Sequence, residues 1–114
     1  MTNLALLIYA ISIVESSGRC DLSIGDAGEL GPLQITPMVI KELGPPWKHK
    51  LCRDYDYSST VFIAYLTKVA PENTNEVWAK VWRKGPSGYK SKTAERYWRK
   101  VKEIMRRKEN EESS

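Results

Sequence analysis

The sequence predicts a mostly α-helical protein with a single domain. Apolar residues recur at spacings of three and four in several separate segments, and those segments end at glycine or proline clusters. No segment shows the apolar-polar alternation that is typical of a strand. The 114 residues, 41% of them hydrophobic, suffice for one core but not for two. We expect about five helices around a buried first helix in residues 1–108, followed by a disordered acidic tail at 109–114.

The first predicted helix is the most apolar segment of the chain. Nearly every position from Leu4 to Val14 is apolar, which predicts a helix buried on almost all sides. Gly18 is expected to end it in a left-handed conformation. Residues 19–31 contain three glycines and predict an irregular loop or a small hairpin.

Two further helices are predicted in the middle of the chain. Thr36 as N-cap and Pro37 at the first helical position begin the second helix, which stops at Gly44 and the two prolines that follow. Residues 47–57 predict a polar, aromatic-containing connection. An apolar stripe then predicts a third helix from near Ser58 to just before Pro71.

The last third of the chain predicts two more helices. Asn73 and Glu76 have the spacing of a capping pair that opens the fourth helix, and the Gly-Pro-Ser-Gly segment at 85–88 is expected to end it. The fifth helix has one apolar face, formed by Ala94, Tyr97, Trp98, Val101, Ile104 and Met105.

Composition and charge exclude several classes of protein. The apolar run at 4–14 is 11 residues, about half of what a membrane-spanning helix needs, and it lacks the basic flank and cleavage site of a signal peptide. With His49 as the only histidine and Cys20 and Cys52 as the only cysteines, we expect neither a metal site nor a cofactor. The net charge is +4, and twelve of the 18 basic residues lie at or after Lys80.

Glu15 is the residue most suggestive of chemistry. It follows the apolar segment at the carboxyl end of a helix that should be buried, so desolvation and the helix dipole should both raise its pKa. A carboxyl with a raised pKa suits a general acid near neutral pH. The alternative is an ordinary glutamate in the solvent-facing last turn of a helix.

Short motifs spread along the chain carry a family resemblance. Glu-Ser-Ser-Gly at 15–18, the glycine-rich stretch at 25–29 and Leu-Gly-Pro-Leu-Gln-Ile at 30–35 together resemble the lysozyme-like superfamily of peptidoglycan-cleaving enzymes. The resemblance is closest to soluble lytic transglycosylase and goose-type lysozyme catalytic domains, with some similarity to invertebrate-type lysozymes. The segments at 81–86 and 97–101 are similar to the Ala-Tyr-Asn-Ala-Gly-Pro motif and the Tyr-x-x-Lys-Val closing helix of the transglycosylases.

The resemblance implies that Glu15 protonates the β-1,4 glycosidic oxygen between N-acetylmuramic acid and N-acetylglucosamine. It also implies that Gln34 lies near the substrate cleft, where backbone amides around Gly31 could bind an N-acetyl group. The alternative role for Gln34 is that of an ordinary capping or surface amide. Such an enzyme would act in the periplasm, outside the cell, or at the wall after delivery by a phage.

A second carboxylate would decide the mechanism. Asp26 is placed where the invertebrate-type enzymes carry a nucleophilic aspartate, and Glu29 is the competing candidate. Lytic transglycosylases need neither, because the 6-hydroxyl of the substrate attacks the anomeric carbon. Asp26 could also simply form an Asx-turn in its glycine-rich loop. Hydrolase and lyase therefore both remain open.

The aromatic residues and cysteines complete the set of candidates. Trp82 stands where the transglycosylases have a tyrosine, so Tyr97 could supply the hydroxyl instead. Trp47, Trp78 and Trp82 could each stack on sugar in a groove or anchor the core, and Trp47, flanked by prolines and lysines, is the best groove candidate. Cys20 and Cys52 could form a disulfide worth about 3 kcal/mol, or could be two buried thiols.

The basic end of the chain admits a rival hypothesis. It would attract an enzyme to anionic wall polymers, or form the phosphate-contacting face of a small nucleic-acid-binding module. A glycan-binding module without catalysis is a further alternative. The nucleic-acid hypothesis explains neither Glu15 nor the glycine-rich loop, so we expect a monomer whose partner is peptidoglycan rather than a specific nucleic acid.

Overall fold

The computed structural model describes residues 1–17 and 28–113. Their elements are α1 (Asn3–Ser16), α2 (Pro37–Leu43), the 3-10 helix η1 (His49–Arg53), α3 (Tyr55–Val69), α4 (Asn75–Gly88) and α5 (Lys92–Ser113). Within these ranges the β pairing is one isolated bridge between Leu30 and Ile35. The expected fold class, a mostly α-helical single domain, is confirmed.

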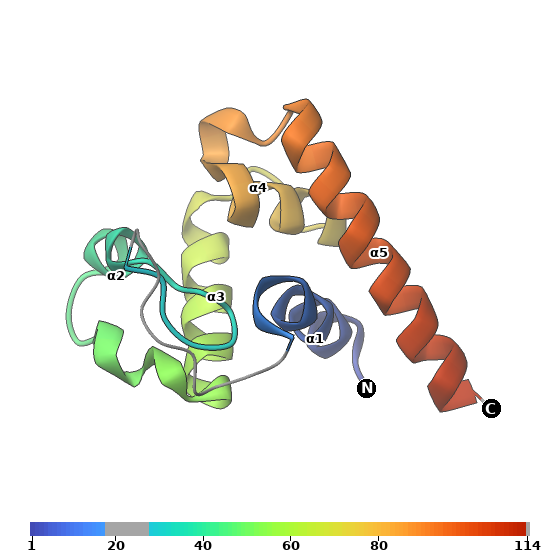
Figure 1. Cartoon of the computed structure of the whole chain (residues 1–114). Coiled ribbons are helices and arrows are strands. Elements are labelled where there is room, and N and C mark those ends of the chain that lie inside the picture. The colour runs from blue at the N-terminus through green and yellow to red at the C-terminus, as the bar shows by residue number, and fades with distance from the viewer. Residues whose placement is uncertain (18–27, 114) are drawn as a thin grey trace.

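Helix α1 lies at the centre of the molecule. Figure 1 shows it nearly end-on between α3 and α5, with α4 passing across one side. Thr2 caps it, since the Thr2 Oγ1 accepts a hydrogen bond from the Ala5 N–H at 3.1 Å. Leu7 and Ile11 are fully buried, as the nearly continuous apolar sequence predicts. The residue with left-handed backbone at the end of α1 is Ser17, while the predicted stop at Gly18 lies outside the described residues.

The core fills the space between α1 and the helices around it. Fully buried apolar side chains come from each of the long helices, and this packing determines where the site residues stand. The principal members are Leu7, Ile11, Val61, Phe62, Leu66, Trp78, Val81, Trp98 and Val101.

The connection before α3 differs from the prediction. Residues His49–Arg53 form a 3-10 helix, and α3 begins at Tyr55 rather than near Ser58. The reason is the cap: the Asp54 carboxylate accepts a hydrogen bond from the Tyr57 N–H at 2.8 Å. Asp54, a favoured N-cap residue, was the signal for this earlier start.

Both ends of helix α4 also differ from the prediction. Its cap is Thr74 rather than Asn73, because the Thr74 Oγ1 accepts from the Val77 N–H at 3.2 Å. Gly85 interrupts the helix with φ 79° and ψ 170°, as expected of a helix stop, but Pro86 then opens another helical turn that runs to Gly88.

The acidic segment at the end of the chain is helical rather than disordered. Helix α5 continues to Ser113, so residues 109–113 extend it beyond its apolar face. Charge pairs support the extension: Lys108 lies 3.8 Å from Glu111, and the amino group of Met1 lies 3.4 Å from Glu112.

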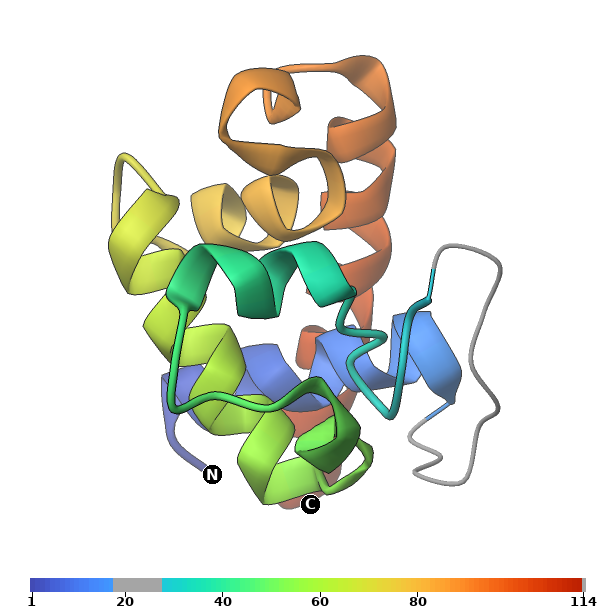
Figure 2. The same ribbon diagram turned by 90° about the vertical axis from the view of Figure 1, so that its left-hand side faces the viewer.

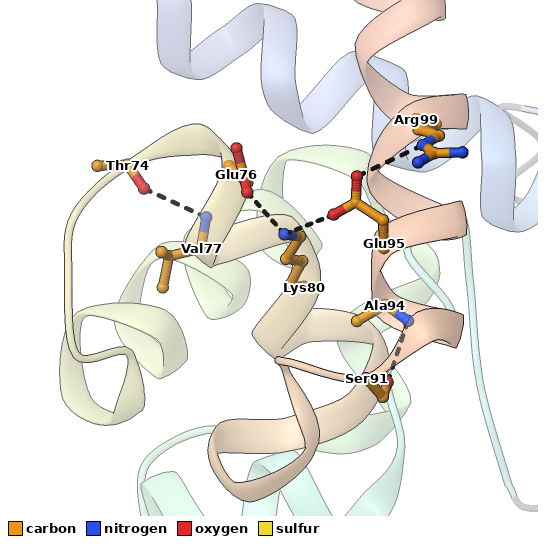
Figure 3. A network of polar contacts seen from close by, with 8 residues as sticks. All are labelled: Thr74, Glu76, Val77, Lys80, Ser91, Ala94, Glu95 and Arg99. Atoms are coloured by element: carbon orange, nitrogen blue, oxygen red, sulfur yellow. Dashed lines mark hydrogen bonds and ion pairs between the residues drawn. The ribbon is translucent and has the colours of Figure 1, made fainter.

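An ion-pair network fixes the start of α5 against α4. The Lys80 ammonium lies 2.6 Å from Glu76 and 2.8 Å from Glu95, and Glu95 also pairs with Arg99 at 3.4 Å (Figure 3). Ser91 caps α5, since its Oγ accepts from the Ala94 N–H at 3.2 Å. The first turns of α5, which carry Tyr97, are thereby held in place.

The turn formed by residues 28–35 packs against the end of α1. Leu30 and Ile35 exchange two backbone hydrogen bonds of 3.0 Å, which close the turn. The Ser16 Oγ donates to the Pro32 carbonyl at 2.7 Å and ties the turn to α1. Figure 2 shows this turn beside the carboxyl end of α1.

Among the described helices, none is long and apolar enough to cross a membrane.

Candidate active site around Glu15

Glu15, in the last turn of α1, is hydrogen-bonded to Tyr97 of α5. The Tyr97 hydroxyl donates a hydrogen bond of 2.7 Å to the Glu15 Oε2 across 82 positions of sequence. Burial raises the pKa of Glu15, and nearby Glu29 raises it further, while the Tyr97 hydrogen bond and Arg83 act in the opposite direction. The net shift is upward, so the carboxyl holds its proton more readily than a solvated glutamate.

Tyr97 is suited to act as a permanent donor. Burial and the neighbouring charge of Glu15 both raise the pKa of its phenol, which keeps the hydroxyl protonated. The guanidinium of Arg83 lies 5.8 Å from the centre of the Tyr97 ring, in cation-π contact. Glu15, Tyr97 and Arg83 therefore form one connected group from α1, α5 and α4.

A cavity of about 400 Å³ opens on one side of this group. Its wall comes from the end of α1, the turn at 28–35, the start of α2 and the middle of α4. The lining residues are Glu15, Glu29, Gln34, Thr36, Val39, Trp82 and Arg83. Four residues predicted from the sequence, Glu15, Glu29, Gln34 and Trp82, thus line the same cavity.

Gln34 occupies an unusual backbone position in the cavity wall. Its φ is +52°, which costs a non-glycine residue about 1 kcal/mol, and its Nε2 donates to the Gly31 carbonyl at 2.9 Å. The closed turn and the Ser16 contact hold this conformation. The Gln34 side chain is therefore fixed at the rim of the cavity rather than free on a surface.

Trp82 serves both the core and the cavity. Its ring packs edge-on against Phe62 at 4.8 Å and Tyr65 at 6.1 Å between centroids, yet the residue remains half-buried and lines the cavity. The two roles considered for this tryptophan in the sequence are thus combined. The packing fixes the orientation of the Trp82 ring at the cavity.

Two other predicted residues lie elsewhere. Trp47 packs edge-on against Tyr57 at 5.8 Å and lines a separate cavity of about 420 Å³ at the end of α2. Gly31 is buried, and a Cβ there would lie 1.9 Å from the Cys52 carbonyl oxygen. Gly31 therefore allows the turn to approach η1.

The remaining candidates fall partly outside the described residues. Asp26 is among the residues not described, and so is Cys20, so the predicted second carboxylate and the predicted disulfide both lie outside them. Cys52 is fully buried, and burial raises the pKa of its thiol to about 11. Within the described ranges no cluster of three or more His, Cys, Asp or Glu side chains could hold a metal ion.

Sequence reasoning missed a second cavity on the other side of Glu15. It measures about 340 Å³, shares Glu15 and Arg83 with the first, and is otherwise lined by Val14, Thr93, Arg96, Tyr97 and Lys100. Thr93, Arg96 and Lys100 share one face of α5 with Tyr97, since helix positions three and four apart are neighbours. That spacing around Tyr97 was the signal that could have found them.

No protein-family model matches the chain, and no curated protein matches its sequence. We therefore base the functional proposal on the residues of the site.

Proposed function

We propose that the protein cleaves peptidoglycan at the β-1,4 bond between N-acetylmuramic acid and N-acetylglucosamine, with Glu15 as general acid and then base. The observation that carries the proposal is the environment of Glu15. Its carboxyl is half-buried, has a raised pKa, accepts a hydrogen bond from Tyr97 and faces a cavity of about 400 Å³. The resemblance of the motifs around Glu15 and Gln34 to lysozyme-like enzymes supports the same activity.

The contacts of Glu15 fit a two-step proton transfer. The Tyr97 hydroxyl donates its hydrogen bond to the Glu15 Oε2, so we place the transferable proton on the Glu15 Oε1. As the bond between the anomeric carbon and the glycosidic oxygen breaks, that proton passes to the oxygen of the leaving sugar. The Tyr97 hydrogen bond and the nearby Arg83 charge then stabilise the carboxylate left on Glu15.

The second step returns the proton to Glu15. The carboxylate accepts a proton from the attacking hydroxyl while the new bond to the anomeric carbon forms. Water as the nucleophile makes the enzyme a hydrolase, and the 6-hydroxyl of the muramic acid makes it a lyase. Glu29, which lines the cavity, and Asp26 are the candidates for a second carboxylate in the hydrolase.

The other cavity residues are assigned to the glycan. The Trp82 ring offers an apolar face on which a sugar can stack, and Gln34 offers an amide for an N-acetyl group. We place the enzyme at the cell wall, in the periplasm, outside the cell or delivered by a phage.

Replacing Glu15 by Gln tests the proposal. The variant keeps the shape of the side chain but has no transferable proton, so release of muropeptides from purified sacculi should stop while the helical circular dichroism stays. The matched control is Glu42→Gln, which changes a glutamate on α2 paired with Lys68 at 3.7 Å. Retained release by the Glu15 variant would refute the assignment. Mass spectrometry of wild-type products separates a lyase, with anhydro ends, from a hydrolase, with reducing ends.

A further inference from the structure

The two cavities beside Glu15 differ in charge. They share Glu15 and Arg83, so these two side chains border both cavities. The first cavity adds Glu29 to the shared pair, whereas the second adds Arg96 and Lys100. The second cavity is therefore the more cationic of the two.

Several cations of α5 form ion pairs, but those of the second cavity are not among them. Arg99 pairs with Glu95 at 3.4 Å, and Arg107 pairs with Glu103 at 3.1 Å. Figure 3 shows Arg99 and Lys80 both directed at Glu95. Among the ion pairs that the described residues form with one another, none includes Arg83, Arg96 or Lys100.

Neighbouring side chains contact two of these cations. Arg83 lies over the Tyr97 ring at 5.8 Å, and an Arg96 Nη2 lies 3.5 Å from the Thr93 hydroxyl. Three positive charges with one adjoining carboxyl attract an anion, and guanidinium groups are well suited to bind a carboxylate through two hydrogen bonds.

We propose that the second cavity binds a carboxylate of the stem peptide that muramic acid carries, next to the bond attacked by Glu15. This inference rests on the proposed function. The lactyl carboxyl of muramic acid is uncharged once it is joined to the peptide, so the nearest anionic groups of the substrate are the peptide carboxylates. The enzyme then acts preferentially on glycan strands that still carry peptides.

A pair of double variants tests the preference. Arg96→Ala/Lys100→Ala removes two charges at the cavity, and Arg99→Ala/Lys102→Ala removes two from other faces of the same helix. The assay compares kcat/KM on purified strands carrying peptides with kcat/KM on strands stripped by an amidase. We expect the ratio of the two values to fall about five- to tenfold in the first variant, as for partly exposed ion pairs, and to stay near wild type in the second. An unchanged ratio in the first variant overturns the inference.

A binding experiment separates failure of the inference from failure of the proposed function. The probe is a soluble muramyl dipeptide, titrated into the Glu15→Gln protein with its carboxylate free or amidated. We expect the dipeptide to bind only with its carboxylate free, and binding to be lost when Arg96→Ala/Lys100→Ala is added. That result supports the anion site even if the wild type cleaves neither kind of strand. Binding that ignores amidation overturns it, as does tighter binding of inorganic phosphate or a single-stranded oligonucleotide at the same residues.

Discussion

Substituting Gly31 by Ala should destabilise the protein through a contact far from Gly31 in sequence. An added Cβ would lie 1.9 Å from the Cys52 carbonyl oxygen, and real Cβ atoms essentially never approach a heavy atom below 3.0 Å. Because the obstacle is backbone, the turn and η1 would have to separate by about 1 Å. That movement disturbs Leu33 and Ile35, which are both fully buried.

Two terms set the size of the effect. The φ of +78° at Gly31 costs an alanine about 1–2 kcal/mol, and overpacking of this kind adds about 1–3 kcal/mol. The control is Gly44→Ala, because Gly44 has a similar φ of +75° and nothing within 4 Å of an added Cβ. The ψ of −177° at Gly44 lies in a region that only glycine adopts readily, so this control shows a backbone cost without overpacking. The Gly31 variant should lose about 2–5 kcal/mol of unfolding free energy relative to the wild type, which is the sum of the two terms.

Urea unfolding followed by tryptophan fluorescence measures both variants against the wild type. A loss below about 2 kcal/mol in the Gly31 variant would refute the tight packing of the turn on η1. The Gly31 variant should also weaken muramyl dipeptide binding or glycan cleavage, because the same turn holds Gln34 at the cavity through Gly31.

Three further predictions concern titratable groups. Because the pKa of Glu15 is raised, the folded state binds its proton more tightly than the unfolded state does, so the charge on Glu15 costs stability above its folded pKa. Glu15→Gln should therefore raise the melting temperature at neutral pH. The gain should fade as the pH falls through the folded pKa and be absent below the ordinary value of 4.5, and a gain independent of pH would contradict this. Tyr97→Phe removes the hydrogen bond that opposes this shift, so the pKa of Glu15 from carboxyl NMR titration should rise, while the Tyr89→Phe control should leave it unchanged. The variant should also lose about 1.5 kcal/mol or more of stability at neutral pH, and a lower Glu15 pKa would show that the contact is wrong. Lys80→Met should lower stability more in dilute buffer than in about 1 M salt, unlike Lys84→Met, because Lys80 links Glu76 and Glu95. Lys80 also holds the pKa of Glu95 below its usual range, so this stabilisation is present above the unfolded pKa and is lost as pH falls through the folded one.

The long helices and the limits of α2 were predictable because their signals are local. Leu4 to Val14 predicted the buried central helix, and Thr36 with Pro37 predicted the start of α2. Gly44 predicted the end of α2, and the apolar stripe of α5 predicted which of its faces is buried. Apolar periodicity and capping residues act within one or two turns, so the chain shows them without its neighbours.

The candidate acid was also visible in the sequence, but its surroundings were not. Glu15 stood out because it ends the most apolar helix, and its raised pKa follows from that burial. Its hydrogen bond to Tyr97 spans 82 positions, and sequence reasoning could offer Tyr97 only as a possible hydroxyl. Packing of α5 against α1 decides that contact, and no local pattern encodes it.

Tertiary structure alone decided how the other residues divide between site and scaffold. It brought Trp82 to the cavity and Trp47 to a different surface, although the sequence favoured Trp47 as the sugar platform. It also set Arg96 and Lys100 beside Glu15 while Arg99 paired with Glu95. The sequence by itself determined the helices and singled out Glu15, whereas the long-range packing of the helices determined the cavities, because a cavity is formed by residues that only folding brings together.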